Sequence, residues 1–184
     1  MHVKKIFLVT IVLLALPANF ATAQASQDHL TPAGKPAAPA NPITPFAWLV
    51  GGVWTADASK IAPGMLRIET QYTWSDNRRF LRFTTHFVSS SGTLNNYDGN
   101  LYWDPAEKSF HIWYQSASGE VTSAPVTLDG DRWQMDFAGT DFDDAPAQLR
   151  VVVDRKSPDL YHWSLSKQSG STQQPLLGLD YARK

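Results

Sequence analysis

Histidine has the widest chemical range of the residues in this chain, because near neutral pH it serves as a general base or a metal ligand. His86, His111 and His162 each lie in a segment where apolar and polar residues alternate. Alternate side chains of a strand point to opposite faces, and each of these histidines shares its face with polar residues. We therefore expect all three histidines to point outward, away from any desolvated pocket that would tune a base.

A second candidate for chemistry is the acidic run Asp141-Phe142-Asp143-Asp144. Carboxylates at this spacing can hold Ca²⁺, but such a loop also needs further oxygen ligands, a glycine and a distal glutamate. Ala145-Pro146 follows instead, so we expect a solvated loop and no metal site.

Other catalytic signatures are missing. The sequence has no G-x-S-x-G, no H-E-x-x-H and no phosphate-binding glycine loop. It also has no cysteine, which excludes disulfides, thiolate metal sites and a cysteine nucleophile. We assign no catalytic residues, and the balance favours a protein that is not an enzyme.

The N-terminus has the three parts of a secretory signal peptide. Lys4 and Lys5 precede an apolar run over 6–16, and Ala23-Gln24-Ala25 fits the rule for a cleavage site. The run is shorter than the roughly 20 apolar residues that span a bilayer. We expect residues 1–25 to be removed near Ala25 and the protein to be periplasmic or secreted. A cut after Ala23 and an uncleaved anchor are the alternatives.

Residues 26–45 contain five prolines and no apolar periodicity, so we expect a disordered Pro/Ala-rich tether before a domain over 46–184. The 16 basic residues of the chain include Lys4 and Lys5, so the mature protein has 14 basic and 17 acidic residues, a net charge of −3. No basic stripe is present, and we expect no nucleic-acid partner.

From Phe46 onward, short alternating segments are separated by turn residues such as Asp129-Gly130, which is typical of antiparallel barrels and sandwiches. We predict an all-β fold: a ten-stranded antiparallel up-and-down barrel after one helical turn over 46–50. Its predicted strands are 52–57, 65–75, 79–88, 96–104, 108–116, 120–128, 131–138, 147–155, 160–168 and 175–183.

Without helices to cover a sheet, the apolar side of each strand must face the barrel interior. We expect Leu66 and Ile68, for example, to point inward, whereas Phe80, Tyr102 and Trp113 are large rings on the outward side. The inward rings are candidate ligand-lining residues: Tyr72, Trp74, Phe83, Trp103, Phe110, Tyr114, Trp133, Phe137, Tyr161, Trp163 and Tyr181.

The segment 46–54, FAWLVGGVW, resembles the N-terminal G-x-W signature of calycin-type barrels, which include lipocalins, fatty-acid-binding proteins and nitrobindins. The domain is also similar to uncharacterised bacterial lipocalin-like domains of the DUF1579 kind. The resemblance implies a barrel-closing signature of Gly52, Trp54 and Arg183, in which the arginine of the last strand packs on the tryptophan. Nitrobindins hold haem through a histidine near the C-terminus, but residues 176–183 contain none, so we expect no cofactor.

These features predict a protein that binds a small hydrophobic molecule inside the barrel. An apolar interior with a few phenols suits such a ligand. Two alternatives remain open: a structural or interaction barrel with a filled core, and an isomerase or hydratase that uses the barrel as a pocket. Ligand identity and oligomeric state do not follow from the sequence.

Overall fold

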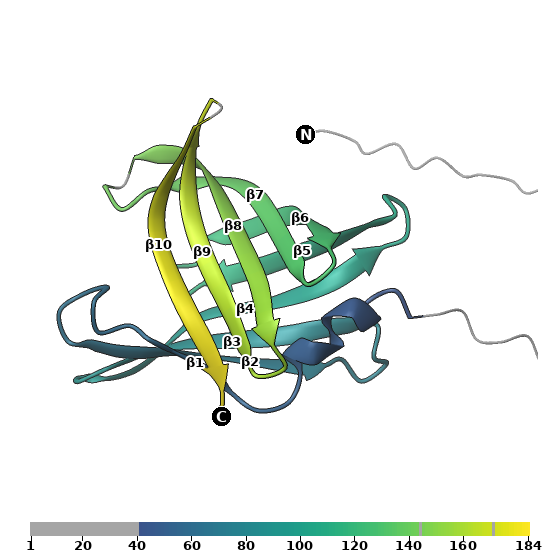
Figure 1. The fold of residues 1–184 in the computed structure, drawn as a ribbon, viewed down its shortest axis with the longest axis horizontal. Helices are drawn as coiled ribbons and strands as arrows, with labels where there is room; N and C mark the ends of the chain where they lie inside the picture. Colours follow the sequence, from purple (N-terminus) through teal and green to yellow (C-terminus); the bar gives the residue numbers. More distant parts are fainter. Residues whose placement is uncertain (1–40, 144, 171) are drawn as a thin grey trace, which may run out of the picture. The chain divides into compact units, whose positions relative to one another are not determined.

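The computed structural model describes residues 41–143, 145–170 and 172–184 (Figure 1). The predicted signal peptide, most of the predicted tether and Asp144 lie outside these residues. In the described part, ten antiparallel strands form one closed barrel, and the only helix is a short 3-10 helix, η1, over Thr44–Leu49. The all-β, ten-stranded barrel predicted from the sequence is confirmed.

Each strand pairs with the next along the chain, and β1 closes the barrel against β10. The strands are β1 Trp54–Asp57, β2 Met65–Trp74, β3 Phe80–Ser89, β4 Gly92–Asp104, β5 Ser109–Ser116, β6 Val121–Asp129, β7 Arg132–Thr140, β8 Pro146–Ser157, β9 Leu160–Ser169 and β10 Thr172–Arg183.

One end of the barrel is closed by η1 and the residues beside it. Ile43, Phe46 and Leu49 are completely buried there. The Phe46 ring packs edge-on against Phe110 of β5 and Trp133 of β7. We call this the sealed end. The opposite end, here the distal end, carries the β1–β2, β3–β4, β5–β6, β7–β8 and β9–β10 connections (Figure 1).

The folded domain begins before Phe46. Ile43, which was predicted to lie in the tether, is buried, and Asn41 donates a hydrogen bond of 2.6 Å from its side chain to the Arg78 carbonyl. The burial of Ile43 could not be predicted from the sequence, because the surrounding residues are rich in proline and a single isoleucine gives no apolar periodicity.

The predicted separation of inward and outward faces holds over most strands and fails at Leu66. The β2–β3 register shifts between Met65 and Arg67, so Leu66 is an extra residue and 48% of its surface is exposed. A bulge leaves its extra residue out of the pairing and changes the direction of the side chain. Ile68, beyond the shift, is buried as predicted.

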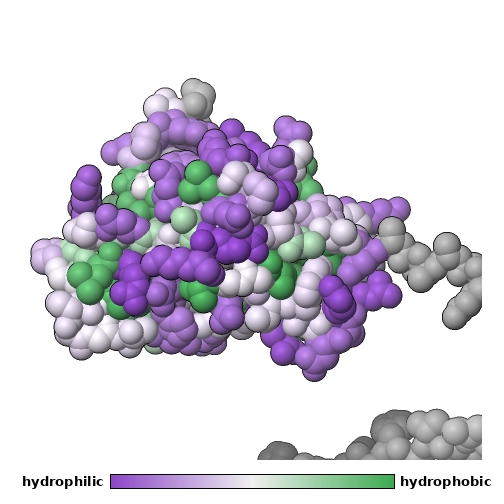
Figure 2. All heavy atoms as spheres, turned by 60° about the horizontal axis from the view of Figure 1, so that its bottom comes forward, coloured by the Kyte–Doolittle hydropathy of each residue, from purple (hydrophilic) through white to green (hydrophobic). Residues whose placement is uncertain are grey.

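Polar residues dominate much of the face shown in Figure 2, where apolar groups occur only in separate patches. Among the described residues, no helix is long and apolar enough to cross a membrane.

Candidate functional site

The sealed end is held together by Arg183. Its guanidinium lies 4.4 Å from the centre of the Trp54 ring, and Trp54 is fully buried. The Trp54 indole N–H donates to the Leu49 carbonyl at 2.7 Å. Gly52 adopts a φ of +79°, and a Cβ there would lie 2.6 Å from the Lys184 carbonyl oxygen. The structure thus brings Gly52, Trp54 and Arg183 together at one place.

Arg183 also serves as a hydrogen-bond donor to four backbone carbonyls. It donates to Trp48 at 2.5 Å, Val50 at 2.9 Å and Gly51 at 2.6 Å, and to Pro158 at 2.9 Å. Three of these carbonyls belong to η1 or the segment after it, and the fourth lies in the β8–β9 turn. The guanidinium therefore joins the sealing segment, residues 48–51, to the β8–β9 turn and to the end of β10.

The predicted lining residues divide into two groups. One group lies at the sealed end: Phe110 and Trp133 pack under Phe46, and the Trp103 ring packs against Phe110 with 4.9 Å between centres. Trp74 ends β2 at the same end, beneath the Arg78 guanidinium. These four side chains are part of the seal.

The remaining rings line the rest of the interior: Tyr72, Phe83, Tyr114, Phe137, Tyr161, Trp163 and Tyr181. Tyr161 lies directly beneath the seal, with 4.8 Å between the centres of its ring and the Trp54 ring and 5.7 Å to the Trp48 ring. The Tyr161 and Tyr181 rings stack with 4.8 Å between their centres. Tyr72 packs on Phe83, which packs on Tyr114. Tyr72, Tyr114, Phe137 and Trp163 contact the core and yet are only partly buried. The interior is therefore not closed to solvent at these positions.

The inner wall also carries hydroxyl groups. Burial raises the pKa of Tyr114 to about 12, against the opposing effect of its hydrogen bond with Thr122. Burial also raises the pKa of Tyr72, Tyr161 and Tyr181 well above that of a free phenol. These groups are consequently neutral at physiological pH and can donate or accept hydrogen bonds.

Two further polar features lie on the inner wall. Thr70 and Thr85, both buried, share a hydrogen bond of 3.0 Å between their hydroxyls. The Trp133 indole N–H is buried with no hydrogen-bond partner among the described residues. A buried donor of this kind is available to a water molecule or a ligand.

An ion pair at the distal end was not predicted from the sequence. Lys167 of β9 lies on the same side of its strand as Tyr161, Trp163 and Leu165, and its Nζ is 2.6 Å from an Asp141 carboxylate oxygen. The side-chain alternation of β9 contains the signal for an inward Lys167. Its partner, however, lies in the β7–β8 connection, where alternation gives no information.

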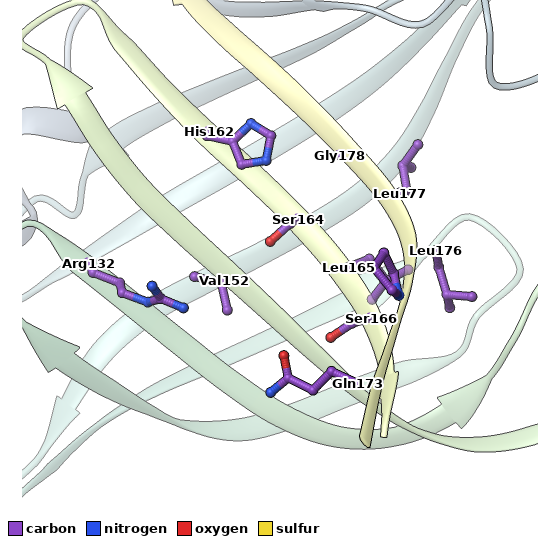
Figure 3. A pocket seen from close by; sticks show the side chains of 11 residues that line it. Arg132, Val152, His162, Ser164, Leu165, Ser166, Gln173, Leu176, Leu177 and Gly178 are labelled. Atoms are coloured by element: carbon purple, nitrogen blue, oxygen red, sulfur yellow. The ribbon is translucent and has the colours of Figure 1, made fainter. Parts of the chain in front are cut away.

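The outer wall of β8, β9 and β10 carries a groove of about 380 Å³ (Figure 3). His162, Ser164 and Ser166 of β9 line it, and His162 Nδ1 is 2.7 Å from Asp180 Oδ1. Among the described residues, no hydrogen bond joins His162 to a serine. The groove therefore lacks the nucleophile–base contact that covalent catalysis uses.

A cluster of possible metal ligands lies on the outside of the β4–β5 turn. One ligand atom each from Asp104, Glu107 and His111 lie within 4.8 Å of one another. His111 Nε2 already lies 2.9 Å from Glu107 Oε2 and 2.9 Å from Ser109 Oγ. His111 points outward as expected, but Tyr102 stacks over it and it is buried. These contacts account for the cluster without an ion.

In the described residues, the protein is a closed ten-stranded antiparallel β-barrel with one end sealed. No family model matches the sequence, and no curated protein matches it. Among solved structures, the chain is similar to one described as the crystal structure of Rv2717c from M. tuberculosis, with 16% sequence identity and a TM-score of 0.48. The match covers 77% of this chain and 96% of that chain.

Proposed function

We propose that this protein is an exported, lipocalin-like barrel that binds a small hydrophobic molecule in its interior and admits it at the distal end. The observation that carries the proposal is the partial burial of inward-facing Tyr72, Tyr114, Phe137 and Trp163. Burying accessible apolar surface contributes about 25 cal/mol per Å², so these rings favour an apolar guest.

The polar groups on the same wall give such a site its selectivity. Neutral phenols such as those of Tyr72 and Tyr114 can orient a ligand that carries one or two oxygens. The arrangement of Gly52, Trp54 and Arg183 supports the calycin-type resemblance, because it has the packing which that resemblance implies.

The test is titration of the purified protein with phenylnaphthylamine, a neutral probe whose fluorescence rises in apolar sites. Trp163→Arg places a charge on the inner wall, and we expect it to weaken probe binding by about tenfold or more. Trp113→Arg is the matched control, since Trp113 lies on the outward side of β5 and is also partly buried.

Two results would contradict the proposal. An unaltered protein that does not bind the probe would indicate a filled barrel. Loss of binding in Trp113→Arg but not in Trp163→Arg would place the site on the outer surface, near Phe80 and Tyr102. Circular dichroism of each variant establishes that it folds. Native mass spectrometry of protein purified from its host would then identify a bound molecule.

A further inference from the structure

Lys167 occupies an unusual place on the inner wall. Its cross-strand partners are Leu149 of β8 and Gln174 of β10, and Leu149 in turn pairs with Phe137 of β7. Directly paired residues share a face of the sheet, so Lys167 lies on the same face as the buried Leu149. Among the described strand residues that face inward between the seal and the distal end, Lys167 is the one with a charged side chain.

The ammonium group of Lys167 has donors to spare. It carries three N–H bonds, and within the part of the chain that the structure describes its partner is a single Asp141 oxygen, Oδ2, at 2.6 Å. The other oxygen, Oδ1, accepts the backbone N–H groups of Asp143 and Ala145 at 3.0 and 3.1 Å. Asp141 is therefore fixed by its own loop, with 8% of its side chain exposed, whereas 32% of the Lys167 side chain remains exposed.

A cation in this position has a cost, because it is withdrawn from water beside apolar side chains such as Leu149 and Leu165. One fixed carboxylate offsets part of the cost and leaves two N–H groups of the partly exposed ammonium without a partner among the described residues. Those groups can pair with an anion, and charge-assisted hydrogen bonds are among the stronger polar contacts in proteins.

We propose that Lys167 binds the anionic head group of an amphipathic ligand, such as a carboxylate with an apolar body. This inference rests on the proposed function and adds the ligand's charge to it. The head lies at the distal end beside Lys167, and the apolar body runs along β9 past Leu165 to Trp163. That distance is about 13 Å, at roughly 3.3 Å per strand residue.

The test measures how dodecanoate and dodecanol displace phenylnaphthylamine, because the two competitors share an apolar chain and differ in charge. We expect Lys167→Met to weaken dodecanoate binding by about tenfold or more and to change dodecanol binding by less than about twofold. Lys156→Met is the control: it removes the same charge from an exposed lysine of β8. We expect it to change neither competitor.

Two further variants keep the proposal falsifiable if Lys167→Met does not fold. Asp141→Asn removes the carboxylate that shares the ammonium, so we expect dodecanoate to bind several-fold more tightly. Lys167→Arg keeps the charge and should retain dodecanoate binding. If every variant changed the binding of dodecanoate and of dodecanol equally, Lys167 would not bind the anionic head group, and the proposed function would remain intact. Failure of the unaltered protein to bind phenylnaphthylamine would overturn both.

Discussion

At the scale of single residues, Arg183 shows how one side chain can close a barrel end. Its planar group stacks on Trp54 and donates to the carbonyls of Trp48, Val50, Gly51 and Pro158. A lysine keeps the positive charge but has neither the flat face nor the forked donors. The role of this position therefore depends on guanidinium geometry more than on charge.

Arg183→Lys tests that argument. We expect the free energy of unfolding to fall by about 2–4 kcal/mol, because several carbonyls lose their donor and the stacking on Trp54 is lost. The measurement is urea unfolding followed by tryptophan fluorescence. Arg150→Lys is the control, since Arg150 pairs with Asp136 on the outer wall, where half of the Asp136 side chain is exposed. We expect that change to cost less than about 1 kcal/mol. Equal losses in the two variants would contradict the argument.

At the scale of elements, the close packing of β4 depends on Gly99. A Cβ at this position would lie 2.5 Å from the Trp113 carbonyl oxygen and 2.6 Å from both Phe83 Cζ and Tyr114 Cβ. Two of these three atoms belong to β5 close to its backbone, so they cannot move aside without distorting the β4–β5 ladder. Gly99 thereby lets Phe83 and Tyr114 approach each other inside the barrel.

Gly99→Ala is therefore expected to destabilise the protein by about 1–3 kcal/mol, the usual range for overpacking. Gly139→Ala is the matched control on β7. There the new methyl group would meet the ends of two side chains, Leu149 Cδ1 at 3.1 Å and Phe137 Cε2 at 3.4 Å, which can shift. Thermal unfolding of both variants checks the prediction, and an equal or larger effect of Gly139→Ala would refute it.

The strands were predictable because alternation records which side of each strand is buried. The segment predicted as 147–155 is β8, Pro146–Ser157, and the predicted final strand ends at Arg183 as β10 does. Bulges were not predictable, because an extra residue such as Leu66 leaves the local alternation intact and only changes the pairing. Alternation also identified the inward rings but not which of them form the seal, since that depends on where Phe46 packs.

At the scale of the whole molecule, the ionisable groups predict that stability falls both at acidic and at alkaline pH. The pKa of the Asp136 carboxyl is lowered by its hydrogen bond with Arg150, and the pKa of Asp141 is lowered by Lys167. Because the pKa of these carboxyls is lower in the folded protein, the unfolded chain binds protons at a higher pH than the folded protein does. Stability from these pairs is present above the ordinary pKa of 3.8 and is lost as the pH falls below it.

The tyrosines give the larger effect, on the alkaline side. Tyr72, Tyr114, Tyr161 and Tyr181 have pKa values raised by burial from an ordinary value of 10.0. Above pH 10 the unfolded chain releases these protons while the folded barrel keeps them, so the free energy of unfolding falls as the pH rises. The slope that each group contributes rises from about 0.7 kcal/mol per pH unit at pH 10, where the unfolded phenol is half ionised, towards about 1.4 kcal/mol per pH unit at higher pH.

Four such groups together are expected to remove about 4 kcal/mol between pH 10 and pH 11, a large part of the stability of a typical domain. Unfolding by urea at a series of pH values measures the slope, and tyrosinate absorbance reports when the phenols ionise. We expect the four phenols to ionise together with unfolding. Tyr114→Phe should reduce the slope of the unfolding free energy against pH by the contribution of one phenol. Ionisation of all tyrosines near pH 10 in a barrel that stays folded would contradict the prediction. It would mean that water reaches the phenols freely and that the interior is more open than an apolar binding site requires.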